Sequence, residues 1–254
     1  MADVLVLCYH AVSQGWPASL SVTPEALREQ LGLLVRRGYR GAGFVEAVTS
    51  PPAARTVAVT FDDGFRSVLE LGRPILDELG LKATVFVPTD FPEQPDAPMS
   101  WPGVDQWLGG EHEPELRPMS WEEIQALAEG GWEIGSHTKS HARLTALVDS
   151  ELERELEDSR LILEERLGRP CPGLAYPYGD HDARVVEAAG RAGYTAAGTL
   201  PVRFLRPQLL RWPRAGVYNG DDLWRFRLKV SRVMRMARAT PFWPQREPQG
   251  GVGH

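Results

Sequence analysis

The sequence predicts an α/β protein, a distorted (β/α) barrel of about seven parallel strands that forms a single domain. Three observations lead to this prediction. Apolar runs of strand length alternate with amphipathic segments of helix length along most of the chain. The first run, 4–8, is continuously apolar, as in a parallel strand that is covered on both faces. The chain has 254 residues, 43% of them hydrophobic, which is enough for one large domain with a full core.

The first third of the chain reads as strand, helix, strand, helix, strand. Thr23 is placed to cap the first helix, and Pro24 stands in its first turn. The second helix is expected to stop at Gly80. The predicted strands are 4–8, 57–61 and 83–87.

The same alternation resumes after a long segment, 91–118, that is rich in Pro, Gly and Trp and is predicted to be a loop. Ser120 and Glu123 form a capping box for the next helix, and Ser150 with Glu153 is expected to cap another. Further strands are expected at 132–136, 173–176 and 194–198, with a helix at 183–192.

We expect the barrel to occupy residues 1–222, followed by a basic amphipathic helix at 223–243 and a disordered tail at 244–254. Between Leu223 and Ala239 the chain carries six basic residues and no acidic one, and apolar residues recur at helical spacing. A closing helix packed on the barrel would explain this pattern. The alternative is a surface helix in peripheral contact with anionic lipid.

The composition narrows the class of protein. A net charge of −6 gives no general attraction to nucleic acid, so we expect no nucleic-acid partner. Cys8 and Cys171 are too few for a disulfide scaffold and are expected to be reduced core residues. We read no signal peptide and no transmembrane span, and therefore expect a cytoplasmic protein, either free or peripheral at the inner membrane face. The oligomeric state stays open.

Two adjacent carboxylates, Asp62 and Asp63, follow the predicted strand at 57–61. Such residues often do no more than cap the next helix. In a parallel barrel, however, catalytic residues sit at the carboxyl ends of the strands. Because the chain turns there, one carboxylate could bind a metal while its neighbour reaches a water on that metal.

Two imidazoles, His137 and His141, follow the predicted strand at 132–136. They could be surface or core histidines, or a pair of metal ligands. Their four-residue spacing brings the side chains together only if the segment turns helically. With the two aspartates they would supply two nitrogens and one oxygen to a divalent cation and leave one carboxylate over, which is the equipment of metal-assisted hydrolysis.

Three segments resemble motifs of the polysaccharide deacetylase family, the NodB-like carbohydrate esterases. Residues 60–64 (TFDDG) match its first motif and 137–141 (HTKSH) its second, while 176–180 (YPYGD) are similar to the third. The first two motifs together are specific, and the third is supportive. The resemblance covers residues 4–217.

The resemblance implies that Asp63, His137 and His141 bind a metal and that Asp62 is the general base. It also implies that the backbone N–H of Tyr178 is an oxyanion donor, although the residues alone favour a turn with a packed aromatic ring. Zinc is the expected ion, and two imidazoles with one carboxylate would also accept Co, Ni, Mn or Fe.

The chain departs from the family pattern in two places. Ala175 stands where the third motif usually carries an Arg that braces the base, and the late Leu-x-x-His segment that supplies an acid is missing. Arg214, in a late strand-like run, is the candidate brace, with a surface arginine as the alternative. His10, at the end of the first strand, is the candidate extra polar group, and a core histidine bonded to backbone is its alternative.

The implied reaction is removal of an N-acetyl or similar small acyl group from an amino sugar, in a polysaccharide or a lipid-linked glycan. Two other hypotheses stay open: the same machinery acting on a non-sugar amide, and a catalytically inactive carbohydrate-binding barrel. The tryptophans in or beside the long loop could stack on sugar rings or only pack the loop. They are Trp101, Trp107 and Trp121.

Overall fold

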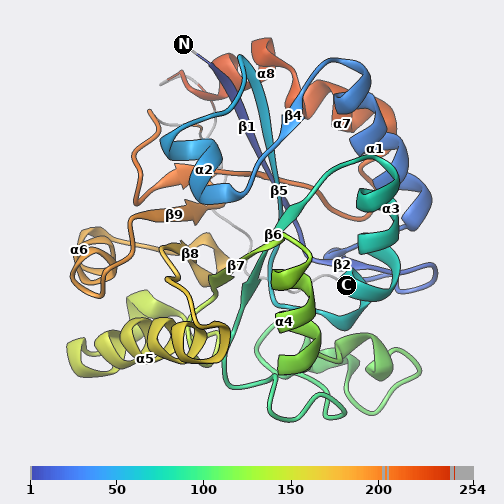
Figure 1. The fold of residues 1–254 in the computed structure, drawn as a ribbon. Coiled ribbons are helices and arrows are strands. Elements are labelled where there is room, and N and C mark those ends of the chain that lie inside the picture. Colours follow the sequence, from blue (N-terminus) through green and yellow to red (C-terminus); the bar gives the residue numbers. More distant parts are fainter. Residues whose placement is uncertain (1, 202–203, 205, 241–242, 244–254) are drawn as a thin grey trace.

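The computed structural model describes residues 2–201, 204, 206–240 and 243. A nine-stranded parallel sheet curves into a nearly closed barrel, and helices lie around it (Figure 1). The strand order is β10-β9-β8-β7-β6-β5-β1-β11, with β4 paired to β5. The predicted fold class is therefore confirmed.

The longest strands lie next to each other in the sheet. β1 and β5 pair from Asp3↔Arg55 to Tyr9↔Phe61, so that Asp62 begins where this ladder ends. The strands are β1 (Asp3–Tyr9), β4 (Arg40–Gly41), β5 (Arg55–Phe61), β6 (Ala83–Val87), β7 (Glu133–Ser136), β8 (Gly173–Ala175), β9 (Ala196–Thr199), β10 (Trp212–Pro213) and β11 (Ala215–Gly216). A separate small sheet pairs β2 (Ala11–Val12) with β3 (Ser21–Val22).

The barrel closes at Arg214. β10 and β11 are separated by this one residue in the sequence, yet they stand at opposite ends of the strand order. β10 pairs with β9, whereas β11 pairs with β1. The stretch 212–216 therefore spans the opening between the two sides of the barrel.

The helices begin and end close to the predicted residues, with one different cap. Thr23 accepts from the N–H of Ala26, and Ser120 and Glu123 form the predicted reciprocal box. The predicted Ser150–Glu153 cap is wrong, because α5 begins at Asp149 and the carboxylate that reaches back to the N–H of Val148 belongs to Glu151. The helices of the barrel are α1 (Pro24–Arg36), α2 (Phe44–Thr49), the π-helical turn η1 (Val68–Gly72), α3 (Arg73–Glu78), α4 (Trp121–Glu129), α5 (Asp149–Leu167) and α6 (Ala183–Arg191).

Helix α2 closes the end of the barrel at which the strands begin. Its apolar residues pack in one cluster with inward residues of the strands, among them Val6, Ala58 and Phe86. Its first N–H groups are satisfied from the sheet, since Phe44 donates to Thr84 and Val45 to the carboxylate of Glu133. The opposite end, where the strands stop, carries the polar residues considered below.

The long loop 91–118 holds two short 3-10 turns, η2 (Asp105–Trp107) and η3 (Glu113–Leu116). Its apolar residues Met99, Val104 and Leu116 are buried. Two further 3-10 turns are η4 (Leu144–Ala146) and η5 (Pro177–Gly179).

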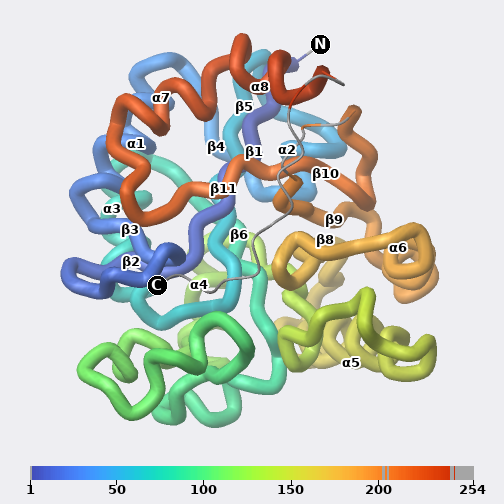
Figure 2. The backbone as a smooth tube through the Cα atoms, turned by 180° about the vertical axis from the view of Figure 1, so that it is seen from behind, coloured from blue at the N-terminus to red at the C-terminus, as the bar shows by residue number. Residues whose placement is uncertain are grey.

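The C-terminal segment forms two helices instead of the single helix expected for 223–243. They are α7 (Leu223–Val230), which lies beside α1, and α8 (Arg232–Arg238), which lies next to the start of β1 (Figure 2). Ser231 is extended and caps α8 by accepting from the N–H of Met234, which breaks the helix. The tail at 244–254 lies outside the described residues. Among the described helices, none has the length and apolar character needed to cross a bilayer.

Candidate metal centre

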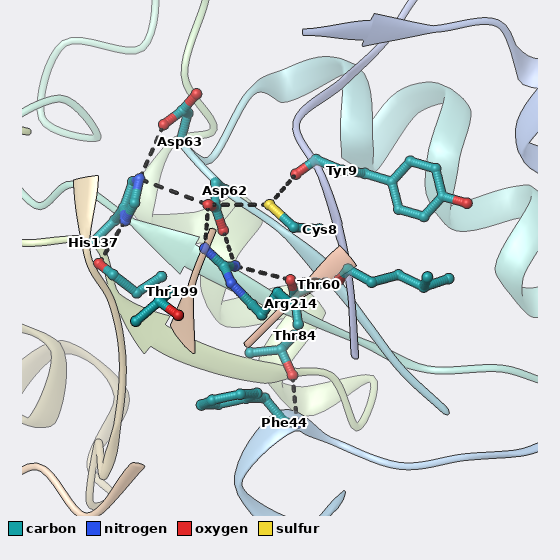
Figure 3. A network of polar contacts seen from close by, with 12 residues as sticks. Cys8, Tyr9, Phe44, Thr60, Asp62, Asp63, Thr84, His137, Thr199 and Arg214 are labelled. Carbon is teal, nitrogen blue, oxygen red and sulfur yellow. Dashed lines mark hydrogen bonds and ion pairs between the residues drawn. The ribbon is translucent and has the colours of Figure 1, made fainter. Parts of the chain in front are cut away.

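Three predicted metal ligands converge at the carboxyl ends of β5 and β7. The Oδ1 atom of Asp63 lies 3.3 Å from Nε2 of His137 and 3.2 Å from Nε2 of His141. All three side chains are buried, with at most 5% of each residue exposed. Figure 3 shows Asp63 and His137 turned toward each other.

These distances fit a divalent cation. Ligand atoms placed 2.0–2.1 Å from a tetrahedral ion are about 3.3 Å apart. Asp63 Oδ1 forms no hydrogen bond in spite of its two close nitrogens, and a buried oxygen without a partner is costly. Burial raises the pKa of Asp63, but the two imidazoles outweigh it and hold that pKa well below its usual range. An ionised carboxylate between two ring nitrogens is a suitable set of ligands for such a cation.

An unusual backbone conformation brings the ligands together. The described non-glycine residues with positive φ are Asp63 (70°), Thr138 (66°), His141 (61°) and Tyr178 (60°), and all four belong to this site. The two histidines therefore approach through left-handed turns and not through the helical turn that their spacing suggested. Strained residues of this kind persist where the surrounding structure holds them and are concentrated at functional sites.

The two histidine rings are held differently. Nδ1 of His137 lies 2.8 Å from the carbonyl oxygen of Ala175, which places a proton on Nδ1 and leaves the Nε2 lone pair toward Asp63. Nδ1 of His141 is buried and has no hydrogen-bond partner among the residues that the structure describes. Its ring instead lies flat against Trp101, with ring centroids 4.2 Å apart.

The second aspartate is bound by the predicted brace. Arg214 donates from Nη1 to Oδ1 of Asp62 at 2.6 Å and from Nη2 to Oδ2 at 2.7 Å (Figure 3). Nη1 also donates to Thr60, and both Arg214 and Asp62 are 1% exposed. Burial raises the pKa of Asp62, but Arg214, His137 and His10 together outweigh this effect and lower that pKa to about 2. Asp62 is thus an ionised, rigidly oriented carboxylate.

Small residues on neighbouring strands make room for this arginine. Ala175 and Gly198 are register partners in β8 and β9, and the backbone of Arg214 donates to Thr199 next to them. A Cβ atom on Gly198 would lie 2.6 Å from Nε of Arg214. The guanidinium therefore reaches Asp62 from the closing stretch 212–216 and not from position 175.

Cys8 also touches Asp62, a contact that the sequence interpretation missed. Its thiol donates to Oδ2 at 3.3 Å. The sequence did contain a signal for this contact. Cys8 and His10 are two residues apart at the end of β1, and strand alternation puts them on one face. The structure brings His10 to the same place: its ring lies beside Tyr218, and ligand atoms of Cys8, His10 and Asp62 lie within 4.8 Å of one another.

His10 is buried, and no described residue forms a hydrogen bond with its Nδ1. Burial lowers the pKa of His10 and so favours the neutral ring. A second cation among these three residues is disfavoured, because the guanidinium of Arg214 already neutralises Asp62.

The aromatic residues near the site have protein partners. Tyr178 has its ring edge against His141, with centroids 4.8 Å apart, and its hydroxyl donates to the carbonyl of Pro102 at 3.4 Å. Trp107 packs on Trp16, and Trp121 donates to Glu93. In the described structure these side chains pack the loops that surround the site.

The fold and the motifs agree with a comparison of the chain with known families. The family model described as polysaccharide deacetylase matches residues 49–197, which is more than half of the chain. This chain belongs to the polysaccharide deacetylase family. The matched part of the chain includes the two aspartates and the two histidines, but neither His10 nor Arg214.

Individual relatives are distant. The chain is similar to the curated protein "Putative polysaccharide deacetylase YxkH" of Bacillus subtilis (strain 168), with 25% identity over 198 residues, and spans 76% of its own length and 63% of that relative's. Among solved structures it resembles the Streptococcus pyogenes deacetylase PplD in complex with acetate (TM-score 0.74, 21% identity, 91% of this chain and 99% of that one). It also resembles IcaB from Ammonifex degensii (TM-score 0.71, 23% identity, 91% and 97% of the two chains). At these identities the structural likenesses show the fold alone.

Proposed function

We propose that this polysaccharide deacetylase is a metal-dependent hydrolase that removes an N-acetyl or similar small acyl group from an amino sugar, in a polysaccharide or a lipid-linked glycan. The observation that carries the proposal is the convergence of Asp63, His137 and His141 beside an ionised Asp62. The acetate bound to PplD, which shares this fold, is the product that such a reaction would release.

The ligand set suits Zn²⁺, and Co²⁺, Ni²⁺, Mn²⁺ or Fe²⁺ would also be accepted. A divalent cation held by Asp63, His137 and His141 would polarise the acyl carbonyl and make a nearby water more acidic. His137 meets the requirement for a ligand with a fixed tautomer, through the carbonyl of Ala175.

Asp62 is assigned as the general base that takes a proton from the attacking water. Arg214 aims this carboxylate by holding both of its oxygens, and keeps it ionised. The thiol of Cys8 is a third donor to this carboxylate and binds Oδ2. The orientation of Asp62 is therefore set before substrate arrives, which removes a reorganisation step from the reaction.

Two further roles complete the proposal. The backbone N–H of Tyr178, in the loop that packs on His141, is assigned to the developing oxyanion. His10, with a free Nδ1 atom near Asp62, is assigned to exchange a proton with the leaving amine. We expect His10→Ala to lower turnover without weakening metal binding.

The test combines metal analysis with acetate release from a panel of N-acetylated glycans. We expect stoichiometric divalent metal in the wild type, and activity that chelator removes and metal restores. Asp62→Asn should keep the metal and lose turnover, whereas His137→Ala should lose both.

Two outcomes would redirect the proposal. Hydrolysis of small amides without acetate release from any glycan would favour the non-sugar amide hypothesis. Glycan binding that is insensitive to chelator and yields no product would favour an inactive binding barrel.

A further inference from the structure

The imidazole of His141 lacks the support that a metal-binding histidine usually has. Such a histidine almost always donates its second ring N–H to a carbonyl or carboxylate, which fixes the orientation of the ring. His137 follows this rule through Ala175. Nδ1 of His141 is buried and forms no hydrogen bond with any residue in the described part of the chain, so something else must hold this ring in place.

Aromatic rings surround His141 on three sides. Trp101 covers one face, with centroids 4.2 Å apart and planes inclined by 25°. The rings of Tyr178 and His137 lie at a steep angle to the His141 ring. Their centroids are 4.8 and 4.9 Å from its centroid, and their planes are inclined to its plane by 70° and 67°. A flat ring in such a space cannot rotate about its Cβ–Cγ bond without displacing a neighbour.

Trp101 is itself firmly held by its loop. It is 6% exposed and packs against Phe91 and Phe65, with ring centroids 5.3 and 6.4 Å away. Its carbonyl accepts from the N–H of Val104 at 3.1 Å. The loop 91–118 therefore provides a rigid wall beside the metal centre.

We propose that Trp101 is a positioning residue for His141, and that its indole face takes the place of the missing hydrogen bond. The inference rests on the metal site proposed above. Because the wall limits ring rotation, His141 keeps its Nε2 atom directed at the position shared with Asp63. Without Trp101, the His141 ring would have to become ordered each time a metal binds. The affinity for the metal should therefore fall, and the metal should dissociate faster.

The test measures metal binding to the apoprotein, by titration with Co²⁺ or Zn²⁺ against a competing chelator and by the rate of metal loss. In Trp101→Leu and Trp101→Met we expect affinity to fall by about tenfold to a hundredfold, the usual effect of removing an outer support of a metal ligand. Trp101→Phe keeps an aromatic face and should recover most of the affinity. Thermal unfolding of each apoprotein shows whether the fold is retained.

Trp107→Leu is the matched control. Trp107 belongs to the same loop but packs on Trp16 and His112, 5.9 and 5.4 Å away between ring centroids. Its replacement should leave metal affinity within about threefold of the wild type, well short of the effect of an outer support. Equal losses in the Trp101 and Trp107 variants would mean that loop packing in general, and not the stacked indole, supports the site.

The results separate this inference from the proposed function. A wild type that binds no divalent metal overturns the proposed function and this inference with it. A wild type that binds metal tightly, together with Trp101→Met that binds it equally tightly and releases it equally slowly, overturns only the role of Trp101. If Trp101→Leu unfolds, Trp101→Met decides the question, since its flexible side chain fills the space without a flat face.

Discussion

Arg214 binds both carboxylate oxygens of Asp62, although 152 positions separate the two residues in the chain. Arg214 stands between β10 and β11, where the barrel closes, and Asp62 stands at the end of β5. The same ion pair therefore joins the last stretch of the barrel to the candidate general base. Correct closure and correct orientation of the base are linked in this protein.

We expect Arg214→Ala to lower both stability and turnover. Removal of one partner of a buried ion pair leaves an uncompensated charge and costs about 3–5 kcal/mol. Loss of the fixed orientation of Asp62 should lower kcat on the order of a hundredfold. Arg214→Lys should recover part of the stability but little of kcat, because an ammonium cannot hold both oxygens at once. Denaturant unfolding and acetate release measure the two effects.

Arg211 offers a matched control three residues earlier. It is exposed and donates to Gln208, so Arg211→Ala should change stability by no more than about 0.5 kcal/mol. Wild-type kcat in Arg214→Ala would show that Asp62 needs no brace.

A second prediction concerns the space that Gly198 leaves for Arg214. A methyl group there would lie 2.6 Å from Nε and 2.7 Å from Cδ of the arginine. We expect Gly198→Ala to cost about 1–3 kcal/mol and to lower kcat while metal content stays constant. Gly15→Ala is the control, because no atom lies within 4 Å of its added methyl group. An unchanged kcat in Gly198→Ala would show that the arginine can move aside without consequence.

The sequence predicted the elements of the barrel well because its strands are long enough to show a pattern. β1, β5 and β6 are mostly apolar runs of five to seven residues, and the motif residues follow strand ends, where a parallel barrel places its site. The closing strands showed only as one late strand-like run near Arg214, since β10 and β11 have two residues each.

The contacts within the site were harder to predict for a different reason. The stacking of Trp101 on His141 joins a loop to a turn, and no periodicity relates the two. The left-handed conformation of Thr138 leaves no mark in the sequence, because a β-branched residue rarely adopts it. The break between α7 and α8 did have a signal, as Ser231 is a good N-cap inside a helical pattern.

A third prediction concerns the effect of pH on stability through Glu133. Burial raises the pKa of this carboxyl to about 7 from its ordinary value of 4.5. Between these two values the unfolded chain is ionised while the folded protein retains the proton, so the free energy of unfolding falls as pH rises. This loss of stability is complete above pH 7 and is absent below pH 4.5.

Glu133→Gln should remove this dependence. Between pH 5 and pH 8, the free energy of unfolding of the variant should rise relative to that of the wild type by on the order of 2 kcal/mol. Glu129→Gln, at an exposed position in α4, should show no such gain. Urea unfolding at the two pH values measures it, and parallel pH profiles for wild type and Glu133→Gln would contradict the raised pKa.

The last prediction concerns the surface of α7 and α8. Phe226 and Val230 pack inward, whereas four apolar side chains point outward. Exposed arginines at 225, 227 and 232 accompany them. A surface that combines tryptophan, aliphatic side chains and positive charge suits the interface of an anionic bilayer. The outward apolar residues are Trp224 (68% exposed), Leu228 (42%), Val233 (79%) and Met236 (61%).

We predict that the protein binds vesicles containing anionic lipid more strongly than zwitterionic vesicles, and that salt weakens the binding. Trp224→Ser combined with Val233→Ser should abolish sedimentation with vesicles, whereas Val148→Ser, at an equally exposed position beside α5, should not. Equal binding by the double variant, or no binding by the wild type, would refute the prediction. α8 contacts the start of β1 through Arg235 and Asp3, and the metal centre lies beyond the strand ends, about 20 Å further along the barrel. A bilayer at α8 would therefore lie at the end of the barrel opposite the metal centre.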